Sequence, residues 1–347
     1  IVDTVGSETL VMSSGTGTTS SPNAATYASA GINEGSLTLG DGTGLASNYT
    51  LTGHAAGSFQ INQRALNSLG SREYDGTSIA SSSDLTLSNL VGSDTLILSG
   101  NGTVADVNVA INKTVTVNTL SLADNTGLAS NYTLTGGTHQ LNITQRSVTL
   151  SGTRSYDGTN TVSNSDLTIG NLVGSETLTL TGAGTIASKD VGSNKSVTDV
   201  SFGLSDNTGL ASNYMIGTKT FNITKQTITI DGSKIYDGNT TVAASDISTF
   251  NGLALTETLT INGSGTIAAP SVGTNKVLTL GTLTLADGSN GGESSNYNLT
   301  SGTFDVTTRP ITLSGSRVYD GTTTVANTDI TTFTNVVSGE ALAVTGS

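Results

Sequence analysis

Residues 147–158 read Ser-Val-Thr-Leu-Ser-Gly-Thr-Arg-Ser-Tyr-Asp-Gly, and this stretch decides the fold. Val148 and Leu150 alternate with polar residues, which gives a strand one buried face and one solvated face. Threonine suits an extended backbone because β-branched side chains fit a pleated surface. The closing Asp157-Gly158 supplies a side-chain cap and a residue that adopts positive φ. The stretch therefore predicts a strand that ends in a tight turn.

Two tyrosine motifs recur along the whole chain. Tyr-Asp-Gly is spaced by 82, 80 and 83 residues, and Ser-Asn-Tyr by 83, 82 and 83 residues. A period of this length exceeds the roughly 20–50 residues of a solenoid coil and matches a small domain. We predict a partial repeat at 1–65, complete repeats at 66–146, 147–226 and 227–309, and a partial repeat at 310–347. The tyrosines are Tyr74, Tyr156, Tyr236 and Tyr319 in the first motif, and Tyr49, Tyr132, Tyr214 and Tyr297 in the second.

The repeat 147–226 shows what one unit is made of. Short alternating segments are separated by clusters of Gly, Asn, Asp and Ser about every ten residues, as turns require. We predict an all-β tandem array of small antiparallel, Ig-like β-sandwiches that form an elongated rod, with a continuous β-solenoid as the alternative. The four-residue link at 224–227 is too short for free swivelling. The predicted strands are 147–150, 166–169, 176–181, 196–200 and 221–223, with one short helical turn within 161–166.

Composition excludes several classes of function. The 347 residues carry a net charge of −13, which disfavours nucleic acid and anionic membranes as partners. There is no cysteine, so disulfides, thiolate metal sites and cysteine nucleophiles are excluded. No apolar run is long enough for membrane insertion. Both chain ends fall inside a repeat, so we expect an excerpt of a longer protein.

The most specific motif is Arg/Lys-x-Tyr-Asp-Gly. The basic residue and the tyrosine share one face of a strand, so the cation can lie along the ring or pair with a nearby carboxylate. We interpret the motif as structural, with a ligand pocket as the alternative; no base or nucleophile recurs beside it, so catalysis is not expected. Its residues are Arg72, Tyr74, Asp75 and Gly76; Arg154, Tyr156, Asp157 and Gly158; Lys234, Tyr236, Asp237 and Gly238; and Arg317, Tyr319, Asp320 and Gly321.

Some oxygen-bearing residues are candidates for Ca²⁺. Asp124 with Asn125, and Asp206 with Asn207, precede the Ser-Asn-Tyr motif, although not at calcium-loop spacing. We predict turns with Asx hydrogen bonds there, no cofactor, and Ca²⁺ only as an alternative. The two histidines, His54 and His139, do not recur in the later repeats, so a metal role is not expected.

Two covalent modifications are also considered. Lys195 could form an isopeptide bond with Asn213, with Glu176 as proton shuttle, but a turn lysine is the simpler interpretation. Asn-x-Thr sequons are frequent, and in a chain rich in Asn and Thr many arise by chance. Among them are those that begin at Asn48, Asn131, Asn142, Asn222 and Asn298.

The tandem Tyr-Asp-Gly-Thr units, each with Leu-x-Gly-x-(Glu/Asp)-x-Leu and a late Ser-Asn-Tyr, resemble the YDG repeats of very large bacterial exoproteins. Many of those are similar to filamentous-haemagglutinin-like adhesins and biofilm matrix proteins exported by two-partner secretion. The resemblance implies a secreted, cell-surface stalk that carries a distal binding domain or builds matrix fibres.

We therefore expect a structural function and no enzyme activity. The partners would be neighbouring repeats of the same chain, other copies in a fibre, or extracellular polysaccharide. The alternative is a repeated carbohydrate- or Ca²⁺-binding module that acts by avidity.

Overall fold

The computed structural model describes residues 4–28, 31–51 and 58–345 of the chain. It contains many short strands and, as helices, single 3₁₀ turns, which confirms the all-β tandem-repeat class. The chain divides into two compact units. Unit 1 comprises residues 1–148, 171–178 and 206–215, and unit 2 comprises residues 149–170, 179–205 and 216–347. No helix in the described ranges is long and apolar enough to cross a membrane.

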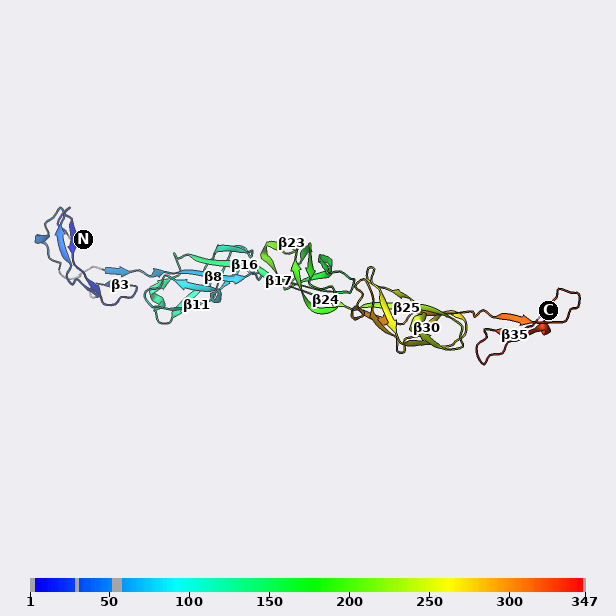
Figure 1. Cartoon of the computed structure of the whole chain (residues 1–347). Helices are drawn as coiled ribbons and strands as arrows, with labels where there is room; N and C mark the ends of the chain where they lie inside the picture. Colours follow the sequence, from blue (N-terminus) through cyan, green and yellow to red (C-terminus); the bar gives the residue numbers. More distant parts are fainter. Residues whose placement is uncertain (1–3, 29–30, 52–57, 346–347) are drawn as a thin grey trace. The chain divides into compact units, whose positions relative to one another are not determined.

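Unit 1 contains the repeat 66–146, whose first and last long strands lie side by side (Figure 1). These strands, β8 and β16, pair in parallel, and β7 pairs with β15 in parallel. The predicted sheets were wholly antiparallel, so this is a correction: the chain returns to the first strand in the same direction. The strands are β7 (Arg64–Ala65), β8 (Asn67–Glu73), β9 (Ile79–Ser81), β10 (Leu85–Ser88), β11 (Leu96–Ser99), β12 (Asn101–Thr103), β13 (Ala110–Thr114), β14 (Ser121–Asp124), β15 (Tyr132–Thr133) and β16 (His139–Thr144).

The repeat 147–226 is divided between the two units. A six-stranded sheet has the order β18-β21-β22-β24-β17-β19. Its strands are β17 (Arg146–Ser155), β18 (Thr161–Ser163), β19 (Leu167–Gly170), β21 (Ala183–Ile186), β22 (Gly192–Asp199) and β24 (Tyr214–Thr224), and β20 (Leu178–Thr181) pairs with β23 (Gly203–Asp206).

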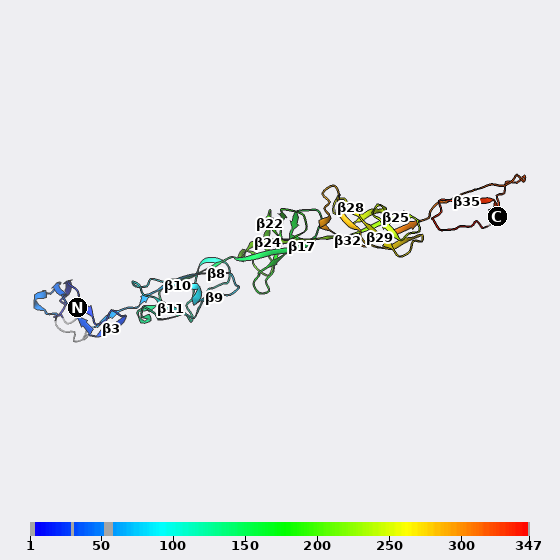
Figure 2. The same cartoon turned by 60° about the horizontal axis from the view of Figure 1, so that its bottom comes forward.

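Unit 2 also holds the repeat 227–309, in which β25 pairs in parallel with β32 and β33. Figure 2 labels both β25 and β32 in this part of the chain. The strands are β25 (Gln226–Ile235), β26 (Thr241–Ala243), β27 (Ile247–Asn251), β28 (Leu259–Asn262), β29 (Ser264–Ile267), β30 (Gly273–Thr279), β31 (Thr284–Asp287), β32 (Tyr297–Thr300) and β33 (Thr303–Thr307).

The hydrophobic core of unit 2 is not confined to single repeats. One cluster joins Leu150, Val162 and Phe221 of the repeat 147–226 to Ile228 and Tyr297 of the next repeat. A second cluster around Ile230, Val242 and Phe304 fills the repeat 227–309. Apolar burial therefore stabilises the joint between these two repeats as well as their interiors.

The link between repeats is shorter than predicted. Only Lys225 separates β24 from β25, where four residues were expected, because both strands extend to the joint. Likewise, Gln145 alone separates β16 from β17.

The described residues 4–28, 31–51, 58–65 and 310–345 form less complete sheets. Three two-stranded sheets (β1-β5, β2-β4, β3-β6) belong to the ranges before residue 66, and β34-β35 belongs to 310–345. The strands are β1 (Leu10–Ser14), β2 (Thr18–Thr19), β3 (Ala25–Ala28), β4 (Ile32–Asn33), β5 (Thr38–Asp41), β6 (Ser58–Ile61), β34 (Thr312–Gly315) and β35 (Ile330–Thr334). The 3₁₀ turns are η2 (Ala46–Asn48), η3 (Ser82–Asp84), η4 (Ala129–Asn131), η5 (Asn164–Asp166), η6 (Ala211–Asn213), η7 (Ala244–Asp246), η8 (Ser294–Asn296) and η9 (Asn327–Asp329).

Candidate functional site at the repeat junctions

In the three complete repeats the Tyr-Asp-Gly motif directly follows the first long strand and forms a capped turn. In the repeat 147–226, Asp157 Oδ1 accepts a hydrogen bond from Thr159 N at 2.9 Å, and Gly158 has φ 79°. Asp75, Asp237 and Asp320 cap their turns in the same way, at 2.9, 2.9 and 3.0 Å. The following glycines, Gly76, Gly238 and Gly321, have φ 76, 76 and 77°.

The basic residue of the motif reaches over this turn. Lys234 Nζ lies 3.0 Å from Asp237 Oδ1 and donates to the carbonyl oxygens of Asn239 and Thr241 at 2.8 and 2.6 Å. Arg154 lies 3.1 Å from Asp157 and stacks over the Phe221 ring. Arg72 and Arg317 likewise pair with Asp75 and Asp320. The cation therefore pairs with the aspartate of its own motif and fixes the turn that presents the tyrosine.

The hydroxyl of the Tyr-Asp-Gly tyrosine donates a hydrogen bond to a carboxylate of the next repeat. In unit 2, the hydroxyls of Tyr156 and Tyr297 donate to the two oxygens of Glu257, both at 2.6 Å. The two rings meet edge to face, with centroids 5.4 Å apart. Tyr156 belongs to the repeat 147–226, and its partners belong to the repeat 227–309. One carboxylate thus joins the Tyr-Asp-Gly and Ser-Asn-Tyr motifs of successive repeats.

A lysine completes this junction. Lys189 Nζ donates to Glu257 and lies 5.5 Å from the centroid of the Tyr156 ring. Glu257 is only 6% exposed. Burial opposes its charge, but hydrogen bonds from Lys189, Tyr156 and Tyr297 hold the pKa of Glu257 below its usual value. The carboxylate is therefore charged, buried and fully partnered.

Unit 1 contains the same arrangement one repeat earlier. Tyr74 and Tyr214 donate to the two oxygens of Glu176 at 2.7 and 2.6 Å, and their rings meet edge to face at 5.4 Å. Val107 stands in the sequence where the later junction has Lys189. The pair of tyrosines and the carboxylate are therefore common to both junctions, whereas the lysine is not.

Other copies of the motifs form parts of this arrangement. Tyr236 donates to Glu340, Tyr132 to Asp94 at 2.5 Å, and Tyr49 to Glu8. Tyr319, in contrast, is 91% exposed.

The asparagine of Ser-Asn-Tyr forms a second bridge between repeats. In unit 1, Asn213 accepts a hydrogen bond from Val109 N and donates one to Asn108, both at 2.9 Å. In unit 2, Asn296 accepts from Val191 N at 2.8 Å and donates to Asp190 at 3.0 Å. Both asparagines are at most 1% exposed. Asn131 makes the equivalent bonds to Ala24 and Asn23, so a glycan at this sequon would disrupt the contact.

Arginines at the joints hold an asparagine that adopts positive φ. Arg146 donates to the carbonyl and side-chain oxygens of Asn171, both at 2.7 Å, and to Tyr74 O at 3.4 Å. Arg64 and Arg309 bind Asn89 and Asn335 in the same way. The planar guanidinium suits this two-pronged contact.

The candidate Ca²⁺ oxygens are engaged in turns. Asp124 and Asp206 each accept a backbone hydrogen bond, from Ala129 and Ala211, at 2.7 Å. The Asn125 side chain donates to Thr95, and Asn207 N donates to the Gly209 carbonyl. Within the described ranges, no three His, Asp or Glu side chains gather as metal ligands. His139 is buried between Ser68 and the Leu134 carbonyl, and His54 lies outside the described residues.

The proposed isopeptide partners have other contacts. Lys195 Nζ donates to the Ser188 carbonyl at 3.3 Å, whereas Asn213 is held by Asn108 and Val109. Glu176 accepts two tyrosine hydroxyls. The geometry favours the simpler turn interpretation for the lysine.

Buried tyrosines make the junctions sensitive to alkali. Burial and the hydrogen bond to Glu176 raise the pKa of Tyr74 to about 12, and burial also raises the pKa values of Tyr156, Tyr214 and Tyr297. The usual value is about 10. The pKa of these tyrosines is higher in the folded chain than in the unfolded chain. The stability that their protonated hydroxyls contribute is therefore fully present below pH ~10, and it is lost as the pH rises through the folded-state pKa.

We therefore expect cooperative loss of β-structure between about pH 10 and 12, together with late phenolate formation. Circular dichroism and phenolate absorbance, recorded in one titration, measure both. Full ionisation of all tyrosines near pH 10 with an unchanged spectrum would contradict the expectation. The variant Tyr74→Phe removes one of the ionisable phenols, so the pH at the midpoint of alkaline unfolding should rise.

Three consecutive parts of the chain match the family model of the YDG domain, at residues 62–140, 137–222 and 218–304. A search of curated proteins finds no match for the chain.

Proposed function

Because the chain belongs to the YDG domain family, we propose that it is a stalk or fibre segment of a large secreted bacterial adhesin. In this role the array extends a binding tip from the cell surface or contributes to an extracellular matrix. The chain would belong to a filamentous-haemagglutinin-like protein exported by two-partner secretion. Its function is mechanical, and it carries out no catalysis.

The observation that carries this proposal is the repeated docking of one repeat on the next. Glu257 and Glu176 each bind one tyrosine from either side of a junction. Asn213 and Asn296 add a second bridge at the same junctions. Bending at a junction would break several of these bonds at once, in a site where buried polar groups must stay paired. Such joints favour extension over free swivelling.

Surface chemistry also supports an extracellular array. The net charge of −13 discourages association between like surfaces and keeps a long repeat protein in solution. The absence of cysteine makes folding independent of the redox state of the compartment.

Small-angle scattering tests the mechanical part of the proposal. We expect the maximum dimension of the chain to correspond to on the order of 30–40 Å per repeat, the size of a small compact domain. The value should not change when Ca²⁺ is added or chelated. A compact globule would contradict the stalk. Contraction of the chain on chelation would favour the Ca²⁺-binding module.

Localisation needs a separate experiment on the cells that make the protein. Brief protease treatment of intact cells should release peptides of residues 62–304, or the peptides should be found in the culture medium. Recovery from lysed cells alone would exclude a secreted stalk.

A further inference from the structure

The first and last strands of a complete repeat run side by side in the same direction. In the repeat 227–309, β25 pairs in parallel first with β32 and then with β33. This pairing, β25 against β32 and β33, is the seam of the repeat. The chain enters the repeat at Gln226, the start of β25, and leaves it after Thr307, the end of β33. Because the pairing is parallel, these two points lie at opposite ends of the seam.

Tension along the chain acts on the seam as shear. A pull on the residues before Gln226 draws β25 backwards, and a pull on the residues after Thr307 draws β33 forwards. The strands then separate by sliding, and the evenly spaced parallel hydrogen bonds carry the load together. A pair of strands that is peeled from one end breaks one bond at a time. Sliding would also drag Phe304 and Val306, which are at most 2% exposed, through a close-packed core.

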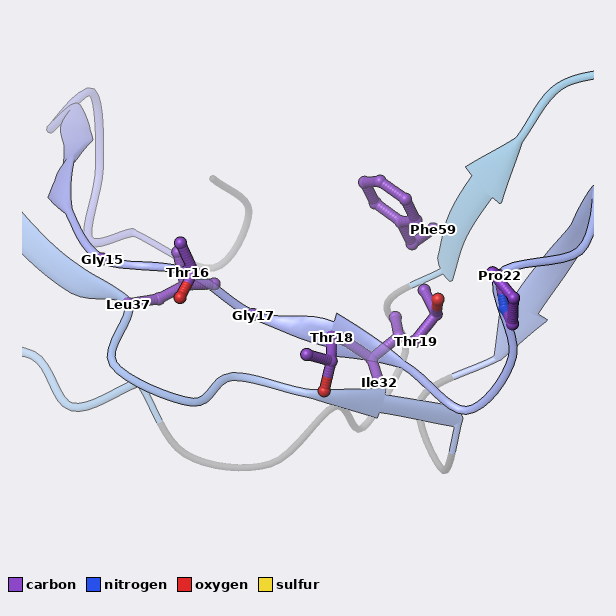
Figure 3. Close-up of a pocket in the computed structure, with 9 residues that line it drawn as sticks. All are labelled: Gly15, Thr16, Gly17, Thr18, Thr19, Pro22, Ile32, Leu37 and Phe59. Carbon is purple, nitrogen blue, oxygen red and sulfur yellow. The ribbon is translucent and has the colours of Figure 1, made fainter. Parts of the chain in front are cut away.

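A second phenylalanine shows how much of the ring the seam covers. Phe59 on β6 also lies five residues before an arginine, but β6 forms a two-stranded sheet with β3. The Phe59 ring is 54% exposed, and it lines a pocket of about 630 Å³ together with Ile32 and Leu37 (Figure 3). Phe304, which lies beside the first strand of its repeat, is fully buried. Opening the seam would therefore expose apolar surface as well as break hydrogen bonds.

The end of the seam is closed by the same two bonds in all three complete repeats. The backbone N–H of the Tyr-Asp-Gly tyrosine donates to the carbonyl of the last threonine of the final strand, at 2.9 Å each time. The hydroxyl of that threonine donates to the carbonyl of the basic residue of the motif, at 3.2, 3.3 and 3.3 Å. These two bonds form a latch. Its members are Tyr74, Thr144 and Arg72; Tyr156, Thr224 and Arg154; and Tyr236, Thr307 and Lys234.

One side chain fills the gap where β25 passes from β32 to β33. Thr229 is the last residue paired with β32, and Gly232 is the first paired with β33. Between them, Asp231 Oδ1 accepts hydrogen bonds from the backbone N–H and the hydroxyl of Thr303, at 2.8 and 2.9 Å. Bonds between the first and last strands therefore continue along the whole of β25.

We propose that the complete repeats are force-bearing clamps, in which the seam and its latch resist tension that passes along the chain. Only Lys225 separates β24 from β25, so load on one repeat passes directly to the next. Tyr156 acts at both places: its N–H closes the latch of its own repeat at Thr224, and its hydroxyl binds Glu257 of the next repeat. The shear geometry follows from strand direction alone, whereas its use by the cell rests on the stalk function proposed above.

The direction of pulling tests the clamp. Because the chain has no cysteine, two introduced cysteines give unique attachment points for single-molecule force spectroscopy. Lys225→Cys with Thr308→Cys loads the seam in shear. Ile235→Cys with Thr308→Cys, at one end of the same strands, peels it, and all three positions are exposed. At the same loading rate, we expect unfolding in shear to need at least about twice the force.

Unfolding in shear should also release the whole repeat in one step. Residues 226–307 span about 270–300 Å when fully extended, against on the order of 30–40 Å when folded. The step should therefore be about 230–260 Å long. Equal forces in the two pulling directions, or gradual lengthening without a step, would overturn the clamp.

Two threonines with similar bonds test the latch. Thr307→Val removes the hydroxyl bond to the Lys234 carbonyl and should speed unfolding in shear about two- to tenfold. The matched control is Thr260→Val, which removes a hydroxyl bond from β28 to the Asp287 carbonyl of β31, at 3.1 Å and outside the seam. It should change the same rate less than about twofold. Equal effects of the two substitutions would show that the latch bears no particular load.

Failure of the clamp and failure of the stalk give different results. Equal forces in the two pulling directions, in a chain with the expected scattering dimension, would overturn the clamp and leave the stalk intact. A higher force in shear, in a chain that scatters as a compact globule, would overturn the stalk and leave the clamp intact.

Discussion

Replacement of Glu257 by alanine is expected to destabilise the junction between the repeats 147–226 and 227–309 by about 3–5 kcal/mol. The change removes the acceptor for Tyr156 and Tyr297, and it leaves Lys189 without its carboxylate. Two buried hydroxyls then lose hydrogen bonds to a charged group, each worth about 1.5–3 kcal/mol. Because the Lys189 side chain is about one-third exposed, water can solvate its ammonium group once the carboxylate is gone, and the loss should not exceed this range.

The same substitution at Glu340 is the matched control. Glu340 binds Tyr236 but is exposed, so water replaces the lost contact and the cost should stay below about 1 kcal/mol. Hydrogen exchange followed by mass spectrometry measures each repeat separately, which a single melting curve of a repeat array does not. Faster exchange in β25 and β32 of the Glu257 variant is expected. Equal effects of the two substitutions would show that burial does not strengthen the junction.

The Tyr-Asp-Gly turn could be predicted from sequence because its contacts are local. Asp157 caps Thr159, two residues away, and the paired Arg154 lies three residues before Asp157. Turn chemistry of this kind depends on neighbouring residues only. The destination of the tyrosine hydroxyl was not predicted, since Glu257 lies 101 residues beyond Tyr156. A usable signal was present: an acidic residue recurs at spacings of 86, 82, 81 and 83 residues, at Glu8, Asp94, Glu176, Glu257 and Glu340.

Two features of the sheets could not be predicted from the hydrophobic periodicity of the sequence. Alternation identifies a strand but not its direction, so the parallel pairing of β8 with β16 was missed. β21 was missed because Gly184 interrupts its apolar pattern. A Cβ at Gly184 would lie 2.6 Å from the Phe202 ring, so the glycine permits close packing that only the tertiary structure reveals.

Replacement of Phe304 by alanine should cost about 3–5 kcal/mol, as expected for a large side chain removed from a close-packed core. Phe304 is fully buried among Ile230, Val242 and Leu278. Phe59→Ala is the matched control, because this equivalent position is 54% exposed and should cost less than about 1 kcal/mol.

Hydrogen exchange of β25 and β33 measures the first variant, and exchange of β3 and β6 measures the second. Both phenylalanines lie on a last strand of the same repeat pattern, so the difference isolates the contribution of the first strand packed over the ring. If Phe59→Ala were as costly as Phe304→Ala, burial of the ring would not be the source of the stability that Phe304 contributes. The exposure of the Phe59 ring would then not explain the difference expected between the two variants.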